Sequence, residues 1–383
     1  TLGPGGIMYG QRGIPALLEF CKDMSEVSAP DVLFMNYSNP MAMLTWACNK
    51  YGYGVKTIGL CHGVTHTARM LARVLDVPYE ELDYSCSGIN HQTWYLSLKH
   101  KGVELKDRLL EAFEKDPETA GHEKVRVDML TRFGYFSTES NGHLSEYLPW
   151  YRKRLEDLPN WIDLGSWIWG ETGGYLRVCT ESRNWFEHDF PTWMSEDPWT
   201  FEPEKRGQEH GSYIIEALET GRMYRGHFNV VNNGVISNLP DDCIIETPCY
   251  VDANGIGVPH VGDLPLGCAA VCNASVSVQR IAVEAAVHGD DYLLRQAMLL
   301  DPLTGAVCTP PEVWQLTDEM LVELGEWLPQ YPRAIEEAKA RLASGDLLPT
   351  QDYNGVRVHT KTVEEMEAER EESRKIAAAA DKG

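Results

Sequence analysis

A regular alternation of buried strands and helices near the start of the chain constrains the fold most. The apolar runs "DVLFMNYSNP" (31–40) and "VKTIGLCHG" (55–63) are typical of buried parallel strands, and each is followed by a helical segment. Strand, helix, strand and helix at this spacing predict a doubly wound α/β sheet. Because ligands bind beyond the carboxyl ends of such strands, Asn39 and Cys61 lie at candidate binding positions.

The pattern changes after residue 85. Residues 84–102 alternate as antiparallel strands do. Residues 230–258 hold two turn signals between β-rich runs, which predict a hairpin with "NNG" (232–234) as its turn. Upstream of the first strand, an amphipathic helix is expected over residues 13–29, with Pro15 in its first turn.

Charge and composition restrict the partners. The 383 residues carry a formal net charge of −23, which argues against nucleic acid and against an anionic membrane surface, because both need a basic patch. No apolar run approaches the length that spans a bilayer, and no signal peptide opens the sequence. The ten cysteines are scattered without a CxxC pair, which indicates reduced thiols and a cytoplasmic protein.

The opening residues carry glycines without a complete nucleotide motif. The sequence starts at Thr1 in "TLGPGGI", a glycine-rich turn that leads into a helix. We expect further residues of this fold to precede it, because a natural amino terminus rarely begins there. A dinucleotide fingerprint needs a strand, then GxGxxG, then a helix. That order is absent from the sequence, so no cofactor-binding residue is predicted.

The first candidate site combines Cys61 and His91, each at the end of an expected strand. A thiolate and an imidazole can hold a divalent transition metal and leave positions open for substrate oxygens. The alternative is a small buried cysteine and a hydrogen-bonded core histidine. Spacing alone favours this alternative, because short motif matches are often false.

Other polar residues remain open to two interpretations. Asn39 before Pro40 could contact a substrate hydroxyl or form a turn, and His62 could be an acid or a helix-capping neighbour. Titratable groups also crowd into "GYFSTESNGHLSEY" (134–147), which could hold a general base or be an ordinary polar helix start. These groups are Tyr135, Glu139, His143, Glu146 and Tyr147.

Several stretches together resemble glycoside hydrolase family 4, the NAD- and metal-dependent glycosidases, and most closely its α-galactosidase branch. The motifs occur in that family's order up to about residue 330. They are "TLGPGGI", "NYSNPMAM", "GLCHGV", "GINHQTWY", "GYFSTES", "HLSEYLPW", "NNGVISNLP" and "VDANGI".

The resemblance implies a lactate-dehydrogenase-like fold. Residues 1–85 would be the remainder of a Rossmann-type dinucleotide domain, 86–360 an α+β domain for substrate and metal, and 361–383 a charged tail. It implies a homo-oligomer that acts on a small glycoside.

The resemblance also implies site residues and a mechanism. Cys61 and His91 would hold Mn²⁺, and Asn39 and Asn90 would bind substrate. NAD⁺ would oxidise the sugar at C3, the metal would polarise the ketone, and a base would remove the C2 proton before elimination. The base would be Tyr135 or, as second choice, Tyr147, with His62 as a further catalytic candidate.

Three alternatives remain. The residue after His62 is Gly63, where the α-galactosidase pattern has serine, so α-glucosides, α-glucuronides and α-galacturonides stay open as substrates. A 2-hydroxy-acid dehydrogenase would share the fold and an Asn-Pro after a strand, but would not need a metal-binding Cys61. A binding module without catalysis is the third.

Overall fold

The protein is described here by a computed structural model that covers residues 2–162, 185–195 and 206–349. It consists of two units. The first comprises residues 1–161 and 209–350, and the second comprises 162–208 and 351–383. In the second unit the main described element is α10 (Trp185–Ser195). The charged tail expected at 361–383 lies outside the described residues.

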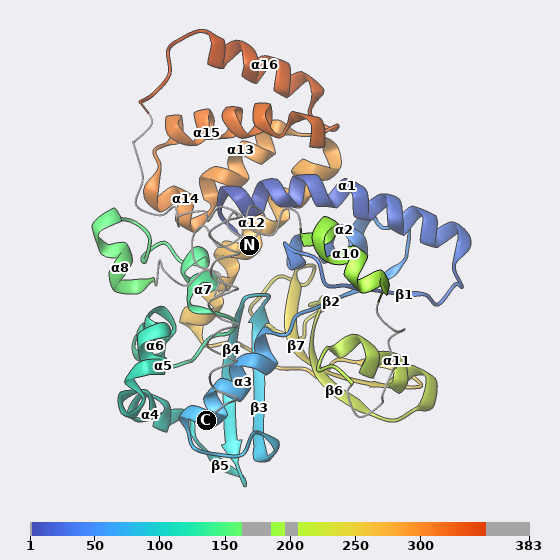
Figure 1. Cartoon of the computed structure of the whole chain (residues 1–383), viewed down its shortest axis with the longest axis vertical. Coiled ribbons are helices and arrows are strands. Elements are labelled where there is room, and N and C mark those ends of the chain that lie inside the picture. The colour runs from blue at the N-terminus through green and yellow to red at the C-terminus, as the bar shows by residue number, and fades with distance from the viewer. Residues whose placement is uncertain (1, 163–184, 196–205, 350–383) are drawn as a thin grey trace. The chain divides into compact units, whose positions relative to one another are not determined.

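The first unit contains one mixed sheet with helices around it (Figure 1). Its strands are β1 (Leu33–Asn36), β2 (Lys56–Leu60), β3 (Leu82–Ile89), β4 (Gln92–His100), β5 (Val103–Glu104), β6 (Tyr224–Val231), β7 (Ile244–Asp252) and β8 (Gly255–Gly257). Its α-helices up to β6 are α1 (Gly3–Val27), α2 (Met41–Tyr51), α3 (Gly63–Val74), α4 (Leu109–Lys115), α5 (Pro117–His122), α6 (Lys124–Phe133), α7 (Asn141–Tyr147), α8 (Leu158–Trp161) and α11 (His210–Thr220). Those after β8 are α12 (Leu266–His288), α13 (Asp291–Leu300), α14 (Pro302–Val307), α15 (Pro310–Glu323) and α16 (Pro332–Ala343).

The expected α/β arrangement is confirmed at the start of the chain. β1 and β2 are parallel neighbours, with Leu33 opposite Lys56 and Asn36 opposite Gly59. The helix α2 connects them and ends at Gly52. Asn39 and Cys61 therefore follow the carboxyl ends of two adjacent parallel strands.

The first helix is longer than the sequence indicated. It begins at Gly3 rather than at residue 13, so Pro15 lies inside it. Proline has no N–H to donate to the carbonyl four residues earlier, which here belongs to Gln11. The side chain of Gln330 donates to that carbonyl oxygen instead, at 2.8 Å. A tertiary contact thus provides the hydrogen bond that proline removes.

The rest of the sheet is antiparallel and brings distant segments together. Its order is β1-β2-β6-β7-β3-β4-β5, and β8 pairs with β7. The expected pairing within residues 230–258 is confirmed, and Val235 N–H donates to Asn232 O in a turn at "NNG". However, the connection between β6 and β7 spans residues 232–243 rather than a tight loop. The Asn232 side-chain amide donates to carbonyl oxygens of this longer loop, at Ile236, Leu239 and Pro240.

Antiparallel pairing of residues 84–102 is also confirmed. β3 and β4 are joined by the two-residue turn Asn90–His91, with Ile89 opposite Gln92. The expected domain boundary at residue 85 falls inside β3. Strands from both sides of it share the sheet, and the predicted division into domains stays a prediction.

The main core lies between the sheet and its helices, and α13, α15 and α16 pack against one another at one end of the unit (Figure 1). Among the described helices, α12 alone is long and apolar enough by length and composition to cross a membrane. Half of its most apolar stretch is buried inside the protein, as in a core helix.

Candidate metal centre and active site

Cys61 directly follows β2 and points into the protein. The parallel strand ends there because His62 and Gly63 begin α3. The N–H of Gly63 donates to the Cys61 sulfur at 3.4 Å. Burial, with the nearby carboxylates of Glu139 and Glu246, raises the pKa of this thiol. A cation bound at the sulfur would oppose that rise and favour the thiolate.

His91 occupies the second position of the β3–β4 turn. Its φ is 63°, in the left-handed region that β-carbons disfavour, and only 3% of the residue is exposed. Its Nε2 lies 2.6 Å from Oε2 of Glu139, which is an ion-pair distance. The turn therefore aims a buried imidazole at a carboxylate that comes from a different part of the chain.

Glu139 lies in the loop before α7, and its backbone is held from two sides. Its carbonyl oxygen accepts hydrogen bonds from the Arg126 guanidinium at 2.8 Å and from the Thr67 hydroxyl at 3.2 Å. A β-carbon at Gly63 would lie 2.7 Å from Cγ of Glu139. The glycine after Cys61–His62 thus leaves room for the Glu139 side chain.

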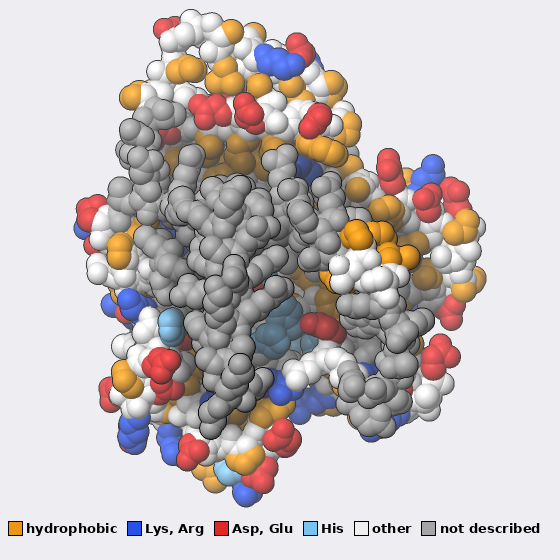
Figure 2. All heavy atoms as spheres, viewed as in Figure 1, with side chains coloured by type: hydrophobic (Ala, Val, Ile, Leu, Met, Phe, Trp, Pro, Cys, Tyr) orange, Lys and Arg blue, Asp and Glu red, His pale blue; other side chains and the backbone are white. Residues whose placement is uncertain are grey.

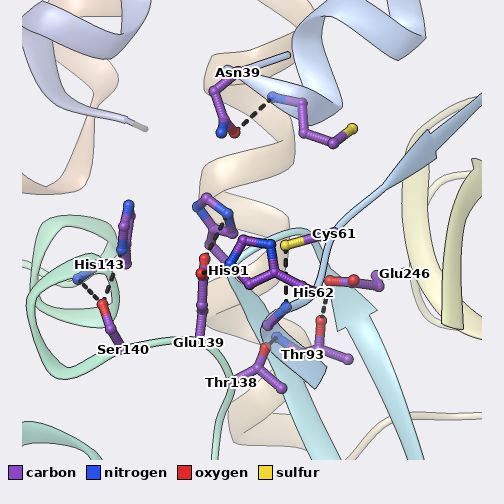
Figure 3. A network of polar contacts seen from close by, with 12 residues as sticks. Asn39, Cys61, His62, His91, Thr93, Thr138, Glu139, Ser140, His143 and Glu246 are labelled. Atoms are coloured by element: carbon purple, nitrogen blue, oxygen red, sulfur yellow. Dashed lines mark hydrogen bonds and ion pairs between the residues drawn. The ribbon is translucent and has the colours of Figure 1, made fainter. Parts of the chain in front are cut away.

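Cys61, His91 and Glu139 form a compact set of possible ligands (Figure 3). One ligand atom from each lies within 4.8 Å of the other two. Thiolate, imidazole and carboxylate are donors for a divalent transition metal, and three protein ligands leave positions open, as in catalytic sites. Burial would raise the pKa of Glu139, but His91 and His143 lower it below its ordinary value. The carboxylate is therefore ionised and available as a ligand.

The other predicted residues take different places around this set. The His62 ring is half exposed and lies between two carboxylates, with Nε2 3.9 Å from Glu139 Oε1 and Nδ1 3.9 Å from Glu209 Oε1. The side-chain oxygen of Asn39 accepts a hydrogen bond from Met41 N–H at 3.3 Å, which forms a turn around Pro40 just before α2 (Figure 3).

The two candidate tyrosines differ in position. Tyr147 is buried at the end of α7, and its ring centroid is 6.4 Å from that of His91. Tyr135 instead lies under the Lys106 ammonium, which is 4.4 Å from its ring centroid. Tyr147, the second choice from sequence, therefore lies beside His91, one of the possible metal ligands.

The cluster of titratable groups expected at 134–147 includes the start of a helix, α7. Ser140 caps α7, because its hydroxyl oxygen accepts from His143 N–H at 3.2 Å. The His143 ring also lies beside that of His91, with 4.6 Å between centroids. Burial lowers the pKa of His143 to about 4, so this ring is neutral near pH 7. The helix-start interpretation is therefore confirmed, and a general base within this motif stays a prediction.

Buried polar side chains adjoin the three possible metal ligands. Neither amide atom of Asn90 makes a hydrogen bond of good geometry to another described residue, although the side chain is close enough to Cys61 to lower the pKa of its thiol. Glu246 on β7 has its carboxyl nearby (Figure 3). We did not predict Glu246 from the sequence. The available signal was an acidic residue within the apolar run "CIIETPCYV" (243–251). Histidine and carboxylate side chains gather near the middle of the face shown in Figure 2.

Comparison with known proteins identifies one family over most of the chain. Residues 1–77 match the profile of "Family 4 glycosyl hydrolase", and residues 86–304 match "Family 4 glycosyl hydrolase C-terminal domain". The chain is 54% identical over 379 residues to an α-galactosidase of Rhizobium meliloti, covering 99% of this chain and 77% of the relative. It is 35% identical to an α-galactosidase of Bacillus subtilis, covering 86% of this chain and 74% of the relative.

Solved structures share the fold. A 6-phospho-α-glucosidase from gut microorganisms, in complex with NAD and Mn²⁺, superposes with a TM-score of 0.67 at 20% identity, covering 86% of this chain and 75% of that one. A 6-phospho-β-glucosidase of Thermotoga maritima with manganese, NAD⁺ and glucose-6-phosphate gives 0.64 at 21% identity, covering 85% and 74%. These relatives give no support to the dehydrogenase or the non-catalytic alternative. The resemblance inferred from the motifs is confirmed: the chain belongs to glycosyl hydrolase family 4 and is a glycoside hydrolase.

Proposed function

We propose that this chain is an α-galactosidase that uses Mn²⁺ and NAD⁺, acts on small galactosides in the cytoplasm and works as a homo-oligomer. The substrate is supported by the two α-galactosidases at 54% and 35% identity. The cytoplasm is supported by the nine described cysteines, all of which are free thiols. The observation that carries the mechanism is the grouping of Cys61, His91 and Glu139 within 4.8 Å.

The residues around this centre have separate roles in binding the metal and binding the substrate. When bound, NAD⁺ and Mn²⁺ supply reversible oxidation of the sugar ring and Lewis-acid activation of the neighbouring C–H bond. Cys61, His91 and Glu139 would hold the metal. Asn90, buried beside Cys61 with its amide atoms unsatisfied among the described residues, would hold a sugar hydroxyl, and Asn39 would bind a second one from the start of α2.

Proton transfer needs a base and an acid. Tyr147 is favoured as the base for the C2 proton, because its ring lies edge-on to the His91 ring, and Tyr135 remains the alternative. His62 would donate a proton to the leaving oxygen. Its half-exposed ring lies 3.9 Å from carboxylate oxygens of both Glu139 and Glu209, and an imidazole is the side chain that most often serves as a general acid.

Hydrolysis assays test the proposal. The reduced protein, given Mn²⁺ and NAD⁺, is expected to cleave a 4-nitrophenyl α-galactoside faster than the matching α-glucoside or α-galacturonide. α-Galacturonidases at 26% identity make the last substrate a necessary comparison. Preference for it, or full activity after chelation and cofactor removal, would contradict the proposal.

Two cysteine variants distinguish the loss of a metal ligand from a general loss of structure. Cys61→Ser should abolish hydrolysis and exchange of C2 deuterium into the sugar, because serine is a poor ligand for a transition metal. Cys86→Ser is the matched control, since Cys86 is a fully buried thiol outside the ligand set. Equal loss in both variants would count against Cys61 as a ligand.

A further inference from the structure

Thr93 connects the two segments that carry His91 and Glu139. Its hydroxyl lies 3.0 Å from Ile89 O, across the turn that holds His91. Its carbonyl oxygen accepts from Thr138 N–H at 2.8 Å, and its own N–H donates to the Thr138 hydroxyl at 3.3 Å. Thr138 directly precedes Glu139. Movement of Thr93 would therefore disturb two of the three possible ligands together.

Glu246 supports Thr93 from the centre of the sheet. It lies on β7 opposite Gly88 of β3, and Gly88 is opposite Thr93 of β4. Cross-strand partners place their side chains on one face of a sheet. Because Gly88 has no side chain, the Thr93 hydroxyl oxygen reaches across it to within 2.8 Å of Glu246 Oε2.

The number of available protons indicates whether the Glu246 carboxyl group is protonated. The Thr93 hydroxyl has one proton but lies within hydrogen-bond distance of two oxygens, Ile89 O and Glu246 Oε2. The carbonyl can only accept. Both contacts are satisfied if Glu246 carries a proton and donates it to Thr93 while Thr93 donates to Ile89.

Burial and charge balance agree with a neutral Glu246. The residue is 1% exposed, and burial, with the charge of Glu139, raises its pKa to about 8. A divalent cation would be balanced by a Cys61 thiolate and the Glu139 carboxylate. A third buried anion beside them would be uncompensated, which is strongly unfavourable.

We propose that Glu246 is a positioning residue of the metal centre, which as a neutral carboxylic acid donates to Thr93 and so fixes the segments that carry His91 and Glu139. This inference rests on the metal centre proposed above. It assigns no contact between Glu246 and the metal or the substrate. The role depends on a neutral hydrogen-bond donor of the size of glutamic acid at this place.

Conservative variants test that dependence. Glu246→Gln keeps the size and can still donate to Thr93, whereas Glu246→Ala cannot. Thr93→Ser keeps the hydroxyl, and Thr93→Val removes it with little change of shape. Mn²⁺ affinity is measured by isothermal titration calorimetry, and the thiolate-to-Co²⁺ charge-transfer band reports the geometry at Cys61. Thermal melting of each metal-free variant confirms that it folds. The control is Glu284→Gln, because Glu284 of α12 forms an ion pair with Lys50 of α2 and lies outside the metal centre.

The expected pattern is specific. Glu246→Gln and Thr93→Ser should bind Mn²⁺ with nearly wild-type affinity and the same Co²⁺ band. Glu246→Ala and Thr93→Val should bind about 10- to 100-fold more weakly, as hydrogen-bond partners of ligating groups generally do when removed. If Glu246→Gln is as weak as Glu246→Ala, or Thr93→Val binds like wild type, this inference is wrong. If the wild type itself binds no Mn²⁺, the metal centre fails and the inference fails with it.

Discussion

Replacing His91 with alanine distinguishes a metal ligand from a core histidine, because the two roles predict different melting behaviour. In the metal-free protein, the change removes the imidazole that lies 2.6 Å from Glu139 Oε2. Leaving a buried polar group without its hydrogen-bond partner lowers the free energy of unfolding by about 1–3 kcal/mol. The Glu139 side chain is 15% exposed, which favours the lower end of that range.

The metal-dependent part of the stability can be worked out separately. At a free Mn²⁺ concentration of about 100 times its Kd, the wild-type protein gains about 2.7 kcal/mol of unfolding free energy. If loss of His91 weakens Mn²⁺ binding about 100-fold, the variant gains only about 0.4 kcal/mol at the same concentration. Unfolding curves with and without Mn²⁺ measure both numbers.

His227→Ala is the matched control. His227 is also buried, accepts from Cys86 N–H at 3.2 Å, and lies outside the ligand set. Loss of the His227 ring should lower the free energy of unfolding by about 1–3 kcal/mol. The stabilisation by Mn²⁺ should be unchanged. A His91→Ala variant that keeps the full wild-type gain from Mn²⁺ would refute the role assigned to His91.

Three further outcomes are expected. Activity should fade in air and return with a thiol reductant, because an oxidised Cys61 is a poor ligand; unchanged activity after peroxide would speak against it. Burial lowers the pKa of His227 to about 3, so the unfolded chain binds one more proton between that value and the ordinary histidine pKa. Stability should therefore rise with pH across this window, and fall as the solution is acidified, by up to about 1.4 kcal/mol per pH unit. His227→Gln should flatten this dependence in denaturant titrations. Gly63→Ala should displace Glu139 and weaken Mn²⁺ binding in calorimetry, whereas Gly121→Ala, with open space around its β-carbon, should not.

Local patterns in the sequence were sufficient for the elements that carry the first two ligands. The apolar run before Cys61 and the alternation around His91 each specify a strand by its own residues, and the structure has β2 and the β3–β4 hairpin there. The motif order also identified the family, because the profile matches lie over the same stretches. The predicted start of α1 was wrong, because the helix begins at Gly3 and continues through Pro15, where Gln330 donates to the Gln11 carbonyl that proline leaves without its helical partner.

Only the tertiary structure shows which residues join Cys61 and His91 at the candidate metal centre. The sequence shows Glu139 only as one of several titratable groups. In the structure, hydrogen bonds from Arg126 and Thr67 hold its backbone, and its carboxylate lies within 4.8 Å of the ligand atoms of Cys61 and His91. Glu246 reaches the site because β6 and β7 enter the sheet between β2 and β3. Residue periodicity records which side of a strand is buried, but not which distant strand lies beside it, because that choice depends on packing of the whole sheet.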